Sequence, residues 1–209
     1  LRDEYGLEDG LADTTTWAEM LERFDSLHLP ADTDRTEPFV SILDPATGTG
    51  TFLVEVIKII HRSMTKRWSA EGFDGGELHQ LWNEYVPAHL LPRLHGFELM
   101  MAPYAVAHLK IGLTLLETGY RPSSNERVHV YLTNSLDPPR DDSDQLSFTI
   151  SALAEETATV NDIKRFKRFT VVLGNPPYSL LSANLSPEHR AIVEPYKFID
   201  GKRIRERGA

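Results

Sequence analysis

Two short stretches of this sequence combine residue types that bind small ligands and do chemistry on them. Residues 44–52 read DPATGTGTF: an acid, two glycines that let the backbone come close to a ligand, and a helix start whose N–H groups can face an anion. Residues 175–178 read NPPY, where the prolines stiffen the backbone. Asn175 and the Pro176 carbonyl then form a rigid pair of hydrogen-bond acceptors. Such a pair suits an amino group that loses a proton as it attacks, and Tyr178 offers a flat face for a planar base.

The first stretch taken alone leaves its ligand open. A phosphate-binding P-loop does not fit, because the Walker spacing and its lysine are absent. A dinucleotide fingerprint needs a third glycine where this sequence has Leu53. A tight strand–helix turn without a ligand remains an alternative. Glu98, further along, can accept both hydroxyls of a ribose, or it can be a surface acid at a strand end.

The elements that position these residues follow from apolar patterns. The patterns predict helices at residues 16–27, 51–64, 77–85, 102–116 and 151–166, and Pro87 and Pro92 are expected to end the third helix. They predict strands at residues 39–43, 93–99, 128–132 and 169–173. This alternation predicts a mostly parallel sheet with helices on both faces.

Each predicted strand ends in, or is closely followed by, a polar residue. These residues are Asp44, Glu98, Asn134 and Asn175. Ligands of such sheets bind beyond the carboxyl ends of the strands, where the strand order reverses. We therefore expect the four side chains to lie along one edge of the sheet and to share one site.

Composition limits the class of protein. The chain has 209 residues, enough for one domain, and a net charge of -9. It has no cysteine, no apolar run near the roughly 20 residues of a membrane helix, and an acidic start unlike a secretory signal. We expect a cytoplasmic protein without membrane contact. Residues 1–40 carry 11 acidic and 3 basic residues, whereas residues 164–209 carry 10 basic and 4 acidic ones. The basic segment can be a solvated face or a local basic patch.

Taken together, the motifs resemble those of S-adenosylmethionine-dependent adenine-N6 DNA methyltransferases. The likeness is to the methylase domain of large single-polypeptide restriction–modification enzymes. Residues 44–52 resemble the family's cofactor loop, residues 96–98 (GFE) its ribose-binding strand end, and residues 175–178 its catalytic motif. Residues 131–136 (YLTNSL) are similar to the segment that contacts the adenine of the cofactor, although Asn134 stands where Asp is common. Residues 196–207 resemble the segment that follows the catalytic loop.

The resemblance implies a Rossmann-like class I methyltransferase fold and S-adenosyl-L-methionine as cofactor. The implied cofactor-binding residues are Asp44, Pro45, Ala46, Thr47, Gly48, Gly50, Phe52, Glu98, Leu99 and Asn134. The implied catalytic residues are Asn175, Pro176, Pro177 and Tyr178. A target adenine would be flipped out of the duplex and stacked on Tyr178, with its amine held by Asn175 and the Pro176 carbonyl. No metal is implied.

The resemblance also predicts domain organisation. Residues 1–38 would be an N-terminal helical and linker segment, and residues 39–209 a catalytic core that is incomplete at its C-terminus. The family's Tyr-Thr-Pro-type segment, which helps hold the methionine end of the cofactor, has no counterpart. DNA would be bound through a recognition domain outside these residues. We expect a fragment of a longer protein that is inactive in isolation.

Three alternatives remain open at this point. The NPPY motif also occurs in enzymes that methylate RNA adenine or a protein glutamine amide. The chain can instead be a non-catalytic module that binds cofactor or DNA. A metal-dependent nuclease would use acids from the segment at residues 137–147, where a solvated acidic loop is the simpler interpretation. Those acids are Asp137, Asp141, Asp142 and Asp144.

Overall fold

A computed structural model of the chain describes residues 1–122, 127–137, 151–176, 194–199 and 201–203. The described residues form two compact units. The first holds the described residues as far as Pro176, apart from Leu136 and Asp137. Those two belong to the second unit, together with the described residues after position 193. Every predicted cofactor-binding or catalytic residue that is described lies in the first unit.

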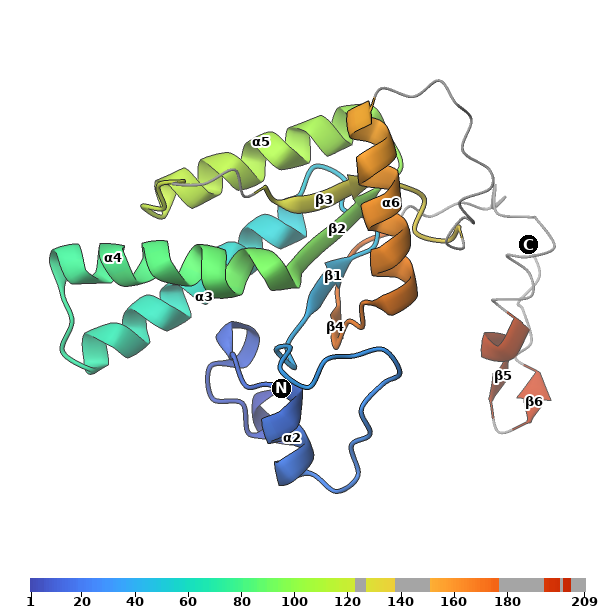
Figure 1. The fold of residues 1–209 in the computed structure, drawn as a ribbon, viewed down its shortest axis with the longest axis horizontal. Helices are drawn as coiled ribbons and strands as arrows, with labels where there is room; N and C mark the ends of the chain where they lie inside the picture. The colour runs from blue at the N-terminus through green and yellow to red at the C-terminus, as the bar shows by residue number, and fades with distance from the viewer. Residues whose placement is uncertain (123–126, 138–150, 177–193, 200, 204–209) are drawn as a thin grey trace. The chain divides into compact units, whose positions relative to one another are not determined.

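The first unit contains a four-stranded sheet in which all neighbouring strands run parallel (Figure 1). Its strands are β1 (Ile42–Asp44), β2 (Leu94–Glu98), β3 (His129–Leu132) and β4 (Val171–Val172). Their spatial order is β3-β2-β1-β4, so the chain moves outward from β1 to β3 and then returns to the other side of β1. The predicted Rossmann-like α/β fold is confirmed.

Strands β1 and β4 begin later than the apolar runs predict, because a side-chain hydroxyl lies between them. Thr170 donates its hydroxyl hydrogen to the Phe39 carbonyl and accepts the Ser41 N–H at 3.1 Å. The hydroxyl makes contacts that backbone groups would make in a regular ladder. The ladder between the two strands therefore starts at Ile42 and Val171.

The α-helices of the described residues largely follow the predicted pattern. They are α1 (Arg2–Tyr5), α2 (Trp17–Arg23), α3 (Thr51–Ala70), α4 (Gly75–Tyr85), α5 (Met101–Glu117) and α6 (Ser151–Phe166). The bounds of α6 agree with the prediction, whereas α3 continues beyond residue 64 and buries Trp68. Helix α2 starts at a capping box of Thr16 and Glu19 and ends earlier than predicted. Within the described ranges, no helix has the length and apolar character needed to cross a membrane.

Helix α4 ends at Tyr85, where the sequence predicts the end of the third helix, but the backbone stays helical through both prolines. The chain continues from α4 through a π-helical turn, η2 (Val86–Leu90), and a 3-10 turn, η3 (Leu91–Arg93). Each proline occupies one of the first two positions of its turn. There its missing N–H costs little, because the first N–H groups of a helical turn have no acceptor within the turn.

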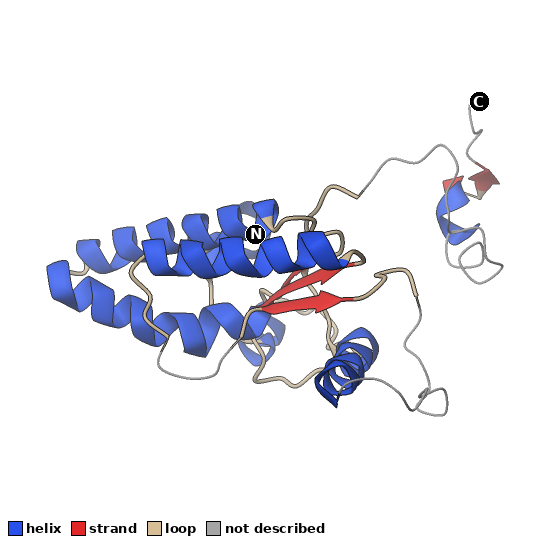
Figure 2. Cartoon of the chain, turned by 90° about the horizontal axis from the view of Figure 1, so that it is seen from above, coloured by secondary structure: helices blue, strands red, loops and turns tan. Residues whose placement is uncertain are grey.

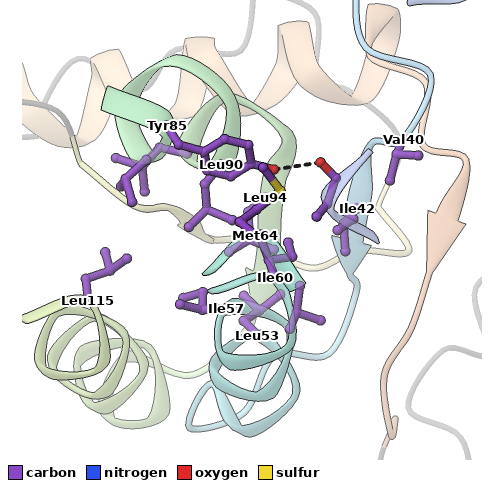
Figure 3. Packing of buried hydrophobic residues seen from close by; sticks show 14 of the residues in the cluster. Val40, Ile42, Leu53, Ile57, Ile60, Met64, Tyr85, Leu90, Leu94 and Leu115 are labelled. Carbon is purple, nitrogen blue, oxygen red and sulfur yellow. Dashed lines mark hydrogen bonds between the residues drawn. The ribbon is translucent and has the colours of Figure 1, made fainter. Parts of the chain in front are cut away.

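Helices cover both faces of the sheet (Figure 2). On one face, α3 buries an apolar stripe against Ile42 and Leu94 of the strands (Figure 3). Side chains alternate along a strand, so the next residue of β1 points to the opposite face. There Leu43 and Phe97 form a second cluster with Val160 of α6.

Residues 1–38 pack onto the same unit as the sheet. The rings of Trp17 and Phe39 meet edge to face with their centroids 4.8 Å apart, and the ring of Tyr5 lies 5.3 Å from that of Phe39. The domain boundary at residue 38 stays a prediction, since shared packing does not decide whether the two parts fold separately.

The buried Arg93 side chain joins the N-terminal segment to the start of β2. Its side chain is 1% exposed, and its guanidinium donates to the carbonyls of Ala12 and Asp13 and to the Tyr85 hydroxyl. The Tyr85 hydroxyl in turn donates to the Ala12 carbonyl at 2.7 Å. A buried charge is tolerated when it is hydrogen-bonded in this way. Arg93 therefore fastens residues 12–13 to the core.

Helix α5 buries one side and exposes an apolar opposite side. Its buried residues are Ala107, Ile111, Thr114 and Leu115. The apolar residues at helical spacing from which this helix is predicted are exposed. They are Ala102, Ala105, Val106, Leu109, Leu113 and Leu116. Leu109 alone is 62% exposed. A helix that is apolar all round gives no sequence signal for the side that will be buried.

In the second unit, the described residues after position 193 form a helical turn followed by a small hairpin. The turn is η5 (Glu194–Lys197), in which the Lys197 ammonium lies 3.1 Å from the Glu194 carboxylate. Strand β5 (Phe198–Ile199) then pairs antiparallel with β6 (Lys202–Arg203). All four strand residues are exposed.

Replacing Arg93 tests its role as a fastener. We expect Arg93→Met to lower the free energy of unfolding by about 3 kcal/mol, because buried oxygens lose their donors. Arg67→Met is the matched control, since Arg67 pairs with Asp9 and Glu71 at the surface and such pairs contribute about 1 kcal/mol or less. Urea unfolding of both variants checks this. Equal losses in the two variants would contradict the assignment.

The two sides of α5 give opposite expectations for the same kind of truncation. Ile111→Ala should lower the free energy of unfolding by about 2–5 kcal/mol, because it leaves a cavity. Leu109→Ala should change it by about 0.5 kcal/mol or less, since that side chain is already largely in water. Denaturant midpoints of the two variants measure the difference. A larger loss for Leu109→Ala would show that the helix is turned the other way.

Candidate functional site

The loop after β1 is a tight turn closed by its own hydrogen bonds. Asp44 is fully buried, and its Oδ1 accepts the Ala46 N–H at 3.1 Å. The Thr47 hydroxyl donates to the Asp44 carbonyl at 3.1 Å, and the Gly50 N–H donates to the Thr47 carbonyl at 2.9 Å. Gly48 and Gly50 have φ values of 56° and 80°, a region that favours glycine. The loop's shape therefore depends on residues that its sequence motif contains.

Glu98 connects this loop to the neighbouring strand β2. Its Oε2 accepts the Gly48 N–H at 2.7 Å, and its Oε1 accepts the Met100 N–H at 2.8 Å. The Thr47 N–H also donates to the Phe97 carbonyl at 2.9 Å. Two predicted cofactor segments, 50 residues apart in sequence, thus lie side by side.

The loop is enclosed so closely that a side chain at Gly96 or at Gly50 would crowd its neighbours. A Cβ on Gly96 of β2 would lie 2.4 Å from the Thr47 hydroxyl oxygen. A Cβ on Gly50 would lie 3.2 Å from Cα and Cβ of Ala107 on α5. A Cβ on Gly48, by contrast, would meet nothing within 4 Å. The loop therefore has two crowded sides and open space above Gly48.

The segment leading to Asn175 lies directly beside this loop. The Leu173 N–H donates to the Leu43 carbonyl at 3.0 Å, which brings the ends of β4 and β1 together. A Cβ on Gly174 would lie 2.7 Å from Asp44 Oδ1. Asn175 and Pro176, which follow at once, are exposed. Pro177 and Tyr178, the other two predicted catalytic residues, lie outside the described residues.

The four polar strand ends lie along one edge of the sheet, as predicted. Because all strands run parallel, the strand order places them in the sequence Asn134, Glu98, Asp44, Asn175. The Thr133 N–H donates to the Glu98 carbonyl at 2.7 Å. The Lys164 ammonium donates a hydrogen bond to the Asn134 carbonyl at 2.7 Å. This bond joins the segment after β3 to α6.

The remaining predicted cofactor residues differ in how far they reach solvent. Phe52 is 44% exposed on the first turn of α3, and Leu99 is 66% exposed immediately after Glu98. Pro45 and Ala46 are half-buried. Phe52 and Leu99 therefore leave apolar surface available next to the polar edge. The ligand-binding roles of all these residues stay predictions.

Burial dominates the electrostatics of Asp44. The pKa of the carboxyl is raised from 3.8 to about 6, with burial as the largest cause; the Ala46 N–H acts against this rise and the nearby charge of Glu98 adds to it. Asp44 Oδ2 is buried without a hydrogen-bond partner among the described residues. Burying a charged oxygen without a hydrogen-bond partner is unfavourable. A ligand that brings a hydrogen-bond donor or a positive charge would stabilise it.

Sequence reasoning gave no role to three residues that shape the site: Gly174, Ala107 and Lys110. Gly96, in contrast, belongs to the GFE segment that the resemblance assigns to ribose binding. Gly174 carried a usable signal, because a glycine at a strand marks a close approach of another chain segment. Ala107 and Lys110 carried none, since they lie on a helix far along the chain. Lys110 donates to the hydroxyls of Thr51 at 3.1 Å and Thr49 at 3.4 Å.

The described residues contain no group of three or more His, Asp or Glu side chains placed to hold a metal ion. Of the acids considered for a nuclease, Asp137 is described. The others, Asp141, Asp142 and Asp144, lie outside the described residues, as does most of the predicted acidic loop.

Comparison with known proteins gives similarity to solved structures alone. No family model and no curated protein matches the chain. A DrdV–DNA complex is 25% identical, over 88% of this chain and 15% of that one, with a TM-score of 0.44. The ATP-dependent Type ISP restriction-modification enzyme LlaBIII bound to DNA is 21% identical, over 85% and 10%, with a TM-score of 0.44. A nuclease-deletion mutant of the Type ISP enzyme LlaGI with a DNA substrate mimic is 22% identical, over 90% and 14%, at 0.42.

The raised pKa of Asp44 predicts a stability difference that depends on pH. The folded protein keeps this proton up to about pH 6, whereas the unfolded chain releases it near 3.8, so the free energy of unfolding falls as pH rises between these values. The loss is up to about 3 kcal/mol. Asp44→Asn removes it, so the variant should be the more stable protein at pH 7 and lose that advantage by about pH 4.

Urea unfolding of the ligand-free protein at several pH values measures this gap. Asp25→Asn serves as the control, because Asp25 is exposed to water. A gap that stays constant from pH 4 to pH 8 would show that burial does not shift the titration of Asp44.

Proposed function

We propose that this chain is the cofactor-binding and catalytic core of an S-adenosylmethionine-dependent methyltransferase. Its target would be the exocyclic N6 of adenine in DNA. One observation carries the proposal: Asp44 Oδ1 lies 2.7 Å from where Gly174 would bear a Cβ, so the loop of residues 44–50 and the segment entering Asn175 adjoin. They adjoin between β1 and β4, where the strand order reverses, the usual ligand position in such sheets.

The residues present fit the adenosyl part of the cofactor. A carboxylate has about four lone-pair sites, and Glu98 uses one on each oxygen for the N–H groups of Gly48 and Met100. Two sites are left for the hydroxyls of a ribose. Leu99, exposed next in the chain, offers apolar surface for the adenine.

The residues also fit the amino-acid part of the cofactor. Asp44 has a buried oxygen without a hydrogen-bond partner among the described residues, which suits an ammonium group. The open space above Gly48 leaves room for a ligand to approach the backbone. When bound, S-adenosylmethionine supplies an electrophilic methyl group.

Asn175 and Pro176 would hold the amine that receives this methyl group. The Asn175 side-chain oxygen and the Pro176 carbonyl accept its hydrogens and stabilise the positive charge that grows on its nitrogen. The ring of Pro176 fixes φ, and a proline at the next position restricts ψ, so the Pro176 carbonyl keeps one direction. Both residues are exposed beside the cofactor loop, where a base flipped out of a duplex has access. We assign the stacking of that base to Tyr178.

The preference for adenine in DNA, and a setting in restriction–modification or another defence system, rest on the resemblance of the motifs. Adenine in RNA and the amide of a protein glutamine offer the same kind of amine to the same two acceptors. Sequence recognition in DNA would belong to a domain outside these residues. The substrate classes must therefore be separated by assay.

Substituting the first acceptor tests the proposal. In the natural full-length polypeptide, we expect Asn175→Ala to lower kcat at least about 100-fold, the usual effect of removing one preorganised hydrogen-bonding group. The dissociation constant of S-adenosylmethionine should stay within about twofold, because the hydrogen bonds described for the cofactor loop are made by other residues. Transfer of a radiolabelled methyl group measures kcat, and calorimetry measures cofactor binding.

The assay offers unmethylated DNA, RNA and protein in turn. Pro176→Ala is the matched variant, since it keeps the carbonyl acceptor and should lose less activity. Methyl transfer to RNA or protein, with none to DNA, would replace the proposed substrate. Full activity of Asn175→Ala would refute the catalytic role, and cofactor binding without transfer to any of the three would indicate a binding module.

A further inference from the structure

We propose that Gly174 is a positioning residue for the catalytic segment. Its missing side chain lets the backbone entering Asn175 lie against the carboxylate of Asp44, and this contact sets the distance between the two halves of the site. The inference rests on the proposed function and names a residue that lies outside the predicted catalytic motif.

Space, rather than backbone conformation, requires glycine at this position. Gly174 is absent from the glycines with positive φ, so its backbone is one that other residues adopt. A Cβ there would lie 2.7 Å from Asp44 Oδ1 and 3.3 Å from Cδ of Pro45. The first distance is shorter than carbon and oxygen atoms tolerate, so an alanine forces one of the two sides to move.

The Asp44 side of this contact is the one that resists movement. Asp44 is 0% exposed, its Oδ1 accepts the Ala46 N–H, and its carbonyl accepts the Thr47 hydroxyl. It also ends β1, which is paired on both sides by β2 and β4. Shifting its carboxylate would disturb bonds within the cofactor loop.

The Gly174 side is less enclosed. Gly174 and Asn175 are both exposed, and Val172 in β4 is 63% exposed. The ladder between β1 and β4 ends at Val172, and the Leu173 N–H then bonds to the Leu43 carbonyl. A methyl group at position 174 should therefore push the following residues outward and leave the cofactor loop in place.

Gly96 provides a contrast on the other side of the loop. A Cβ there would lie 2.4 Å from the Thr47 hydroxyl oxygen, within the cofactor half alone. Substituting Gly96 should disturb cofactor binding. Gly174 differs, because it faces the cofactor loop on one side and leads into Asn175 on the other. Its substitution should affect the reaction step more than cofactor binding.

Gly174→Ala in the full-length polypeptide tests this directly. We expect kcat for methyl transfer to unmethylated DNA to fall about 10- to 100-fold, as for a displacement of the order of 1 Å in a reacting group. The dissociation constant of S-adenosylmethionine should change less than about twofold. Gly76→Ala is the matched control, because a Cβ on Gly76 meets nothing within 4 Å and that position has no positive φ. It should leave both quantities unchanged.

A double variant separates crowding against Asp44 from any other effect of the methyl group. Asp44→Ala alone should weaken cofactor binding, but it also removes the atom that Gly174→Ala would strike. At saturating cofactor, adding Gly174→Ala to Asp44→Ala should therefore cost no further kcat, a non-additive result. Additive losses in the double variant would overturn the proposal.

The remaining outcomes are equally decisive. An unchanged kcat in Gly174→Ala, or a loss of cofactor affinity with kcat retained, would also overturn the positioning role. Such results require an active parent protein. A parent that transfers methyl groups to neither DNA, RNA nor protein contradicts the proposed function instead, so the two failures are distinguishable.

Discussion

The carboxyl end of β1 imposes the constraint on which the rest of the site depends. β1 has a parallel neighbour on each side, so the chain leaving Asp44 must turn within a space that β2 and β4 both border. Gly96 and Gly174 keep that space open by carrying no side chain, and Ala107 of α5 closes it. Close-packed interiors tolerate few changes of volume. The turn therefore keeps one shape, to which a ligand site must conform.

The sequence predicts the parts of this arrangement that repeat at regular spacing. Apolar residues at helical spacing identify α3 and α6, and short apolar runs locate the four strands of the parallel sheet. The polar edge also follows, because parallel strands end on the same side. Asp44, Glu98 and Asn175 could thus be assigned to one region before any contact was known. The sequence pattern predicts where each residue lies along the sheet. The role of its side chain depends on the chemistry of that side chain.

Features that depend on a single contact between distant segments escaped prediction. Arg93 looks like a surface residue in sequence, yet it is buried because its acceptors come from residues 12 and 13. The buried side of α5 was also hidden, since the helix is apolar on both sides. A glycine at the end of a strand signals a close approach, but the sequence does not show that Gly174 approaches Asp44. In each case the determining partner lies far away in the chain, where periodicity carries no information.

The two halves of the site also depend on the fold in different ways. Strands β1 and β2 bring Asp44 and Glu98 together, and the bonds of Glu98 to Gly48 and Met100 hold that half in place. The other half arrives with β4, at contacts such as that of Ser41 with Thr170, 129 residues apart. Strand β4 runs parallel to β1, and a tight turn cannot connect parallel strands. This half of the site therefore forms only when the long connection that leads to β4 has folded. In the proposed enzyme the firmly bonded half would hold the small cofactor. The more exposed half would bind a large substrate. The close contact between Gly174 and Asp44 would set the position of one half relative to the other.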